Sequence, residues 1–130
     1  MVDALRSAHR AVRRGGLVID ARPDPSRQPR IVAAGRVRAQ VRQSPSADLR
    51  DESADSAVAK LVREGLYRVV RSGHVWHSVR FADLADLDAY LADSSRYAAY
   101  GKEMRPKLLP FRRGPLDMRR AIGFDVLERL

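Results

Sequence analysis

Three histidines are the side chains of this sequence best suited to acid–base or metal chemistry, because the chain contains no cysteine. His9 falls on the apolar stripe of a predicted helix, where a packed ring with one hydrogen-bonded nitrogen is more common than a catalytic one. His74 and His77 lie on one predicted strand, and their spacing points the two side chains to opposite faces. We therefore do not expect them to hold one metal ion together.

A second group of residues could form a small aromatic surface. His74 and Trp76 share a face of the predicted strand, and Tyr67 lies across from them on the strand predicted to pair with it. These residues are the candidate ligand or partner surface: Tyr67, His74 and Trp76. The alternative, which the sequence favours, is an aromatic cluster beneath a helix, with Trp76 packed opposite Val69.

Motifs for catalysis or phosphate binding are absent from the sequence. There is no His-Glu-x-x-His motif, no Gly-rich phosphate loop followed by Lys and Ser or Thr, and no nucleophile elbow. Gly15 and Gly16 precede a predicted strand, whereas phosphate-binding glycines follow a strand and open a helix. The run Asp83, Asp86 and Asp88 is typical of a solvated helical face with Asp83 as its N-cap. We expect no catalytic residue, no metal site and no cofactor.

The composition is typical of one soluble globular domain: of 130 residues, 45% are hydrophobic and 32% are charged. No apolar run approaches the roughly 20 residues that span a bilayer. The N-terminus lacks the apolar segment of a secretion signal, and the lack of cysteine suits a reducing compartment. We expect a single cytoplasmic domain over residues 1–130, with 100–130 of uncertain structure, and no membrane partner.

The net charge of +9 suggests nucleic acid as a partner. However, 22 of the 25 basic residues are arginines, and they are scattered along the chain without a tight cluster of five or more. A GC-rich coding sequence also produces such an excess of arginine over lysine. Nucleic-acid binding therefore remains an alternative to a solvated basic surface.

The N-terminal part predicts a helix, a short strand and a loop. Apolar residues at helical spacing predict a helix over residues 2–13, and Gly15 or Gly16 ends it. The apolar run Leu17–Ile19 predicts a strand covered on both faces. Residues 22–30 hold three prolines and predict a loop.

A hairpin is predicted next, from Ile31–Ala33 and Val37–Arg42. Its second run alternates, which places Val37, Ala39 and Val41 on one face and polar residues on the other.

A polar linker over residues 44–52 and a helix from Ser53 or Asp55 to about Glu64 follow. The predicted buried stripe of that helix is Ala54, Ala57, Val58, Leu61 and Val62. Gly65 ends the helix.

The strongest local pattern is a second hairpin over residues 66–81, with Ser72-Gly73 as its two-residue turn. A helix from Asp83 to Leu91 then buries Leu84, Leu87 and Leu91. Together the segments predict an α+β domain with a mainly antiparallel sheet and packed helices.

Two segments resemble the C-terminal portion of class I S-adenosylmethionine-dependent methyltransferases. Val12–Gly16, followed by the strand Leu17–Ile19, is similar to the family's LRPGG-strand segment, and Leu66–Leu91 is similar to its antiparallel end. The family's Gly-rich cofactor turn and its ribose-binding carboxylate have no counterpart here. The resemblance thus implies a truncated Rossmann-like fold without its cofactor.

The leading hypothesis for function is a non-catalytic module that acts by protein–protein contact as a homodimer. The motive is geometric: a methyltransferase sheet that begins at this segment has an unpaired edge, and self-pairing removes such an edge. Two alternatives stay open. One is a methyltransferase-related subunit whose cofactor-binding half lies on a separate partner; the other is a basic nucleic-acid-binding protein.

Overall fold

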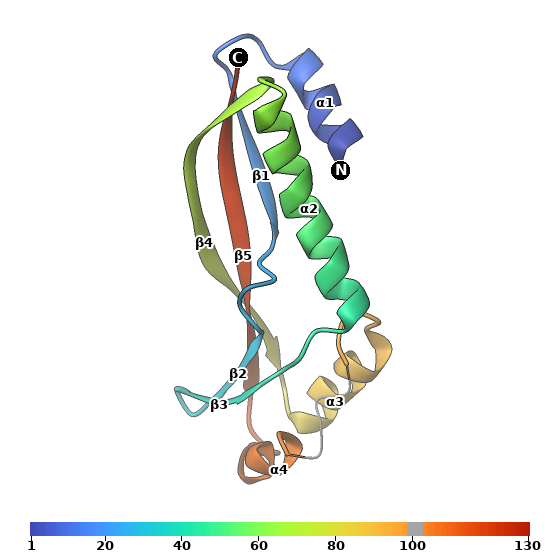
Figure 1. The fold of residues 1–130 in the computed structure, drawn as a ribbon. Helices are drawn as coiled ribbons and strands as arrows, with labels where there is room; N and C mark the ends of the chain where they lie inside the picture. Colours follow the sequence, from blue (N-terminus) through green and yellow to red (C-terminus); the bar gives the residue numbers. More distant parts are fainter. Residues whose placement is uncertain (99–102) are drawn as a thin grey trace. The chain divides into compact units, whose positions relative to one another are not determined.

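The computed structural model describes residues 1–98 and 103–130 as an α+β fold with a mostly antiparallel sheet of five strands (Figure 1). The α+β class and the mainly antiparallel sheet confirm that part of the sequence prediction; the likeness to a truncated methyltransferase fold stays a prediction. In chain order the elements are α1 (Val2–Ala11), β1 (Leu17–Pro23), β2 (Arg30–Ala33), β3 (Arg36–Gln40), α2 (Pro45–Arg63), β4 (Tyr67–Phe81), α3 (Leu84–Asp93), α4 (Arg105–Leu108), the 3-10 helix η1 (Leu109–Phe111) and β5 (Leu116–Arg129). No helix among the described residues is long and apolar enough to cross a membrane.

Strand β5 organises the sheet, because it pairs with three other strands. The strand order is β1-β5-β2-β3, and β4 pairs with β5 as well. β1 is antiparallel to the C-terminal part of β5, with Ile19 opposite Val126. β2 is antiparallel to the N-terminal part, with Ile31 opposite Met118. The residues that pair β5 with its neighbours lie in the C-terminal region for which the sequence predicted no structure.

The chain forms two compact units. Unit 1 comprises residues 1–24, 49–75 and 122–130; unit 2 comprises residues 25–48 and 76–121. β4 and β5 contribute residues to both units. The single domain over 1–130 stays a prediction, and the part of it at residues 99–102 lies outside the described residues.

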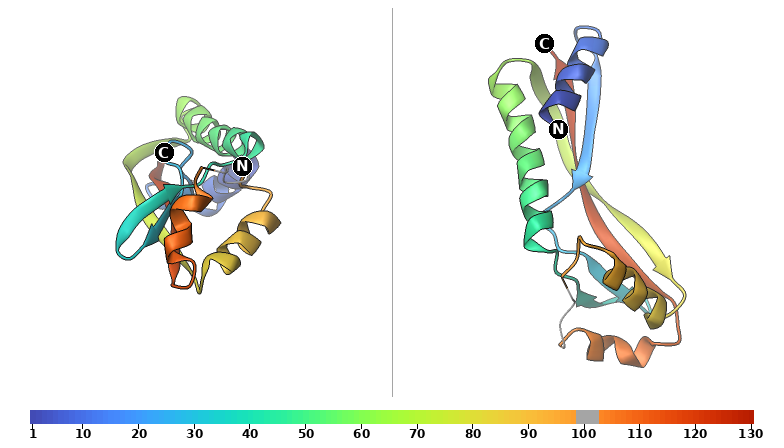
Figure 2. Two further views of the ribbon diagram at one scale, coloured as in Figure 1. Left: turned by 90° about the horizontal axis from the view of Figure 1, so that it is seen from below. Right: turned by 90° about the vertical axis from the view of Figure 1, so that its right-hand side faces the viewer.

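Unit 1 has a small core between its two helices and its strands (Figure 2). The buried residues are Leu5 of α1, Val58 and Leu61 of α2, Tyr67 of β4 and Leu127 of β5. The Tyr67 hydroxyl donates to the Leu5 carbonyl oxygen at 2.7 Å, and the His9 ring packs edge-on against Tyr67 at 5.4 Å. His9 is thus packed as expected, although its Nε2 finds no hydrogen-bond partner among the described residues.

Unit 2 has the larger core, which joins α3 and α4 to one face of β2, β3, β4 and β5. As predicted, α3 buries Leu84, Leu87 and Leu91, and the Asp83 side chain caps it by accepting from the Asp86 amide at 2.9 Å. Leu87, Leu108 and Leu116 are fully buried. These contacts hold α3 and α4 on one side of the unit 2 strands and leave the opposite side open.

The predicted hairpin over residues 66–81 is wrong, because β4 is one continuous strand from Tyr67 to Phe81. A Cβ at Gly73 would lie 2.9 Å from Cζ of Phe124, so glycine permits a close approach of β5 here and makes no turn. The Ser72 hydroxyl donates to an Asp125 carboxylate oxygen. Ser72 and Gly73 therefore both contact β5. The local sequence does not predict these contacts, because β5 is distant along the chain.

The predicted polar linker at residues 44–52 is also wrong, because most of it belongs to α2. Pro45 takes the first helical position, where a missing N–H is harmless. The Ser44 hydroxyl accepts from the Ala47 amide at 3.3 Å and caps the helix. Ala47 is fully buried, so the first turns of α2 contribute to packing. Of the predicted stripe, Ala57, Val58 and Leu61 are buried; Ala54 and Val62 are partly buried.

Two further expectations fail at exposed strand positions. Leu17 and Ile19 are 59% and 69% exposed, so β1 is not covered on both faces; it also continues through Arg22 and Pro23 into the predicted loop. In the β2–β3 hairpin, which is confirmed, a register shift at Ile31/Val32 places Val37 opposite Val32. Val37 is therefore 51% exposed, whereas Ala39 and Val41 are buried as predicted.

Candidate functional site

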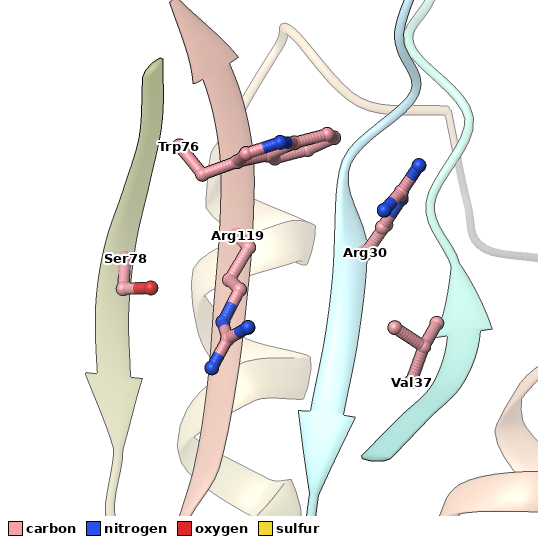
Figure 3. A pocket seen from close by; sticks show the side chains of 5 residues that line it. All are labelled: Arg30, Val37, Trp76, Ser78 and Arg119. Carbon is pink, nitrogen blue, oxygen red and sulfur yellow. The ribbon is translucent and has the colours of Figure 1, made fainter. Parts of the chain in front are cut away.

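Unit 2 contains a hollow on the open side of its strands, with a volume of about 300 Å³. Its lining side chains come from β2, β3, β4 and β5. Figure 3 shows the Trp76 indole reaching from β4 across β5 toward β2. The lining residues are Arg30, Val37, Trp76, Ser78 and Arg119.

Strand register explains why these residues meet. Arg30 of β2 and Arg119 of β5 are direct partners across the antiparallel pair. Trp76 and Ser78 are two residues apart on β4 and so share a face. The bulge in the β2–β3 hairpin turns Val37 to this side. The site thus depends on three strand pairings and one irregularity.

Positive charge dominates the hollow. The Arg30 guanidinium carbon lies 4.4 Å from the centre of the Trp76 ring, a cation–π distance. Among the described residues, neither Arg30 nor Arg119 forms an ion pair. Two like charges directly opposite each other in a sheet repel, so this arrangement is unfavourable unless an anion is bound.

An acidic side chain that interacts with Arg119 is already bound by Arg80. Asp117, two residues before Arg119 on β5, accepts from Arg80 at 2.9 Å and 3.1 Å. The hydrogen bond from Arg80, its charge and that of Arg119 lower the pKa of the Asp117 carboxyl below its ordinary value. Asp117 is therefore ionised at neutral pH, and Arg80 holds it.

The structure separates the residues predicted as one surface. Tyr67 is 1% exposed in the core of unit 1. His74 is exposed on β4 in unit 1, and Trp76 is partly buried in unit 2 against Arg30. Because β4 has no turn, the predicted pairing of Trp76 with Val69 is wrong. Within the described ranges, no three His, Asp or Glu residues gather where they could hold a metal ion.

The arginines of the hollow were missed by sequence reasoning. Their proximity follows from the pairing of β2 with β5, which links distant parts of the chain. The only local signal is the alternation of arginine with apolar or small residues in the strand segments, and a solvated strand face gives the same pattern.

A second charged cluster, in unit 1, is paired internally. Arg22 is bonded to Asp20, to Asp55 at 2.6 Å and to Asp125 at 2.8 Å. Burial alone lowers the pKa of the Arg22 guanidinium, but hydrogen bonds to Asp125 and Asp55 and nearby negative charge raise it above its ordinary value. Burial raises the pKa of the Asp125 carboxyl. The hydrogen bonds from Ser72 and Arg22 and the charge of Arg22 outweigh this effect, so the net pKa lies below its ordinary value. Because all three carboxylates contact Arg22, this cluster is structural.

Comparisons with protein-family models, with curated proteins and with solved structures found no match for this chain.

Proposed function

We propose that this chain is a non-catalytic α+β module that acts by protein–protein contact, as a homodimer formed through β1. The observation that carries the proposal is the exposure of Leu17 and Ile19, at 59% and 69%, on a strand at the end of the strand order. An exposed apolar strand with unpaired backbone groups is a template for pairing with another chain. A twofold-symmetric contact uses one such surface twice.

The charge of the strands favours β1 over β4. β4 is exposed over most of its length, but it carries basic side chains: Arg68, Arg71, His74, His77 and Arg80. Charged residues on an exposed strand oppose association. β1 instead exposes Leu17, Ile19 and Ala21, with Pro23 limiting any pairing at its far end.

The sequence of β1 suits antiparallel self-pairing. A register centred on Ile19 places Ile19 opposite Ile19 of the partner subunit and Leu17 opposite Ala21 of the partner subunit. All of these residues are apolar, and apolar cross-strand pairs stabilise a sheet. The protomer charge of +9 opposes the contact, so added salt strengthens the dimer by screening that repulsion.

We further propose that the module is related to the C-terminal portion of class I methyltransferases and works in the cytoplasm. The antiparallel pairing of β1 and of β4 with β5 supports the relationship (Figure 1). If a separate partner supplied a cofactor-binding half, the same β1 surface would receive it. We expect no saturable binding of S-adenosylmethionine by the chain alone, which calorimetric titration measures; micromolar binding would contradict this.

The dimer is tested with a matched pair of variants. Ile19→Lys adds a charge to β1, and Val75→Lys adds the same charge at a 55% exposed valine of β4. Sedimentation velocity at micromolar protein and moderate salt should give a dimer for the native chain and for Val75→Lys, and a monomer for Ile19→Lys. A monomeric native chain, or equal dimerisation of the two variants, would contradict the proposal.

A further inference from the structure

We propose that the hollow formed by Arg30, Trp76 and Arg119 binds single-stranded nucleic acid, with one nucleotide seated in it. This site lies on unit 2 and is independent of the proposed dimer through β1 in unit 1.

The paired arginines supply the phosphate site. Arg30 and Arg119 are direct cross-strand partners, and no carboxylate of the described residues lines the hollow. A phosphate placed at both guanidiniums relieves their mutual repulsion and accepts charge-assisted hydrogen bonds from each. Arg80 binds Asp117 with two hydrogen bonds. The charge of Asp117 reaches Arg119, but Asp117 does not line the hollow.

Trp76 and Val37 supply the apolar part of the site. Figure 3 shows the indole extending over the strands toward Arg30, with Val37 on the neighbouring strand. The Arg30 guanidinium covers one face of the indole at 4.4 Å. A base that stacks on this face takes the place of Arg30, which then turns to the phosphate, and such stacking does not select the identity of the base. A volume of about 300 Å³ is at the lower end for small-molecule sites and suits a single nucleotide unit.

The wider charge favours a polymer over a free nucleotide or an acidic protein. The net charge of +9 comes from arginines spread along the whole chain. Only a long polyanion can contact several of them while one unit occupies the hollow. An acidic peptide would satisfy the arginines but offers no repeated flat ring for Trp76, and a duplex keeps its bases stacked within itself.

The chain offers a direct probe, because Trp76 is its one tryptophan. Titration of the native protein with a 12-nucleotide poly-uridine strand should quench tryptophan fluorescence and raise the anisotropy of a fluorescein label on the strand, at equal midpoints. A duplex of the same length, poly-glutamate and uridine monophosphate should each bind at least about tenfold more weakly.

Single substitutions test whether the strand binds in the hollow. Arg119→Gln should weaken binding about tenfold and reduce the slope of log affinity against log salt by about 1. The control Arg14→Gln removes the same charge from an exposed position after α1 and should change affinity less than threefold. Trp76→Phe, read by anisotropy, should retain most binding because it keeps an aromatic face, whereas Trp76→Ala should not. A cooperative thermal transition above the assay temperature checks that each variant is folded.

Several results would overturn the proposal. These are no binding of the strand, binding without a change in Trp76 fluorescence, equal losses for Arg119→Gln and Arg14→Gln, or equal affinity for poly-glutamate, the duplex or the free nucleotide.

Discussion

The two units distribute charge in opposite ways. In unit 1, the partly buried Arg22 pairs with three carboxylates, and the open strand β1 displays Leu17 and Ile19. In unit 2, the open strand face displays Arg30 and Arg119 as direct partners, and the residues of the core lie on the other face. The first surface suits apolar contact with protein, and the second suits an anion.

This difference shows that composition alone says little about how a basic chain works. The whole chain carries +9, yet Arg22, which contacts three carboxylates, is structural. Arg30 and Arg119, the arginines with functional potential, form no ion pair among the described residues and line one hollow with Trp76. Local pairing, and not the number of arginines, separates the two cases.

The largest expected effects are on the cores, which test whether the units fold together. Leu61→Ala in unit 1 and Leu87→Ala in unit 2 each remove a fully buried side chain and should cost about 2–5 kcal/mol in denaturant unfolding. Because β4 and β5 run through both units, each variant should show one transition. Leu49→Ala, at a 64% exposed position, is the control and should change stability by less than about 0.5 kcal/mol. Two separate transitions would mean that the units fold independently.

Gly73 tests the continuity of β4. Gly73→Ala should cost about 1–3 kcal/mol, because its Cβ would lie 2.9 Å from the Phe124 ring. Phe124→Leu should make the same substitution less costly, and a double-mutant cycle of unfolding free energies measures this coupling. If Gly73 instead formed a turn, Phe124→Leu would leave its cost unchanged.

Acid should weaken unit 1 through Asp125. Its folded pKa lies below the unfolded value, so its contribution to stability is present above about pH 4 and is lost as pH falls through the folded pKa. Asp125→Asn should cost about 1–3 kcal/mol at pH 7 and reduce the loss of stability below about pH 4. Asp88→Asn, which breaks a more exposed pair with Arg105, should cost less than about 1 kcal/mol. Equal effects would show that the Arg22 cluster adds nothing beyond an exposed pair.

Trp76 should contribute less to stability than a core residue. The sequence favoured a packed indole, whose loss costs about 3–5 kcal/mol. The ring is only partly buried and contacts Arg30, so Trp76→Ala should cost about 1–2 kcal/mol in denaturant unfolding. If Trp76→Ala lowered the free energy of unfolding as much as Leu87→Ala does, Trp76 would be a core residue and not part of a binding site.

The sequence predicts those elements whose determinants are local. Periodic apolar residues and the Asp83 cap predict α3, and Ala34-Gly35, both at positive φ, join the predicted β2–β3 hairpin. The turn predicted at Ser72-Gly73 was wrong because the same residue pair occurs both in turns and where two strands approach closely. Here the Phe124 ring packs against Gly73, which is a strand contact. The hollow was missed for the same reason: Arg30 meets Arg119 only through β5, which the sequence left undefined.

Light scattering of two variants tests most directly whether β1 and the hollow act separately. The native chain and Arg119→Gln should give twice the protomer mass of 14.6 kDa at moderate salt, and Ile19→Lys should give 14.6 kDa. A native mass of 14.6 kDa, or loss of the dimer in Arg119→Gln but not in Ile19→Lys, would contradict the assignment of protein contact to β1.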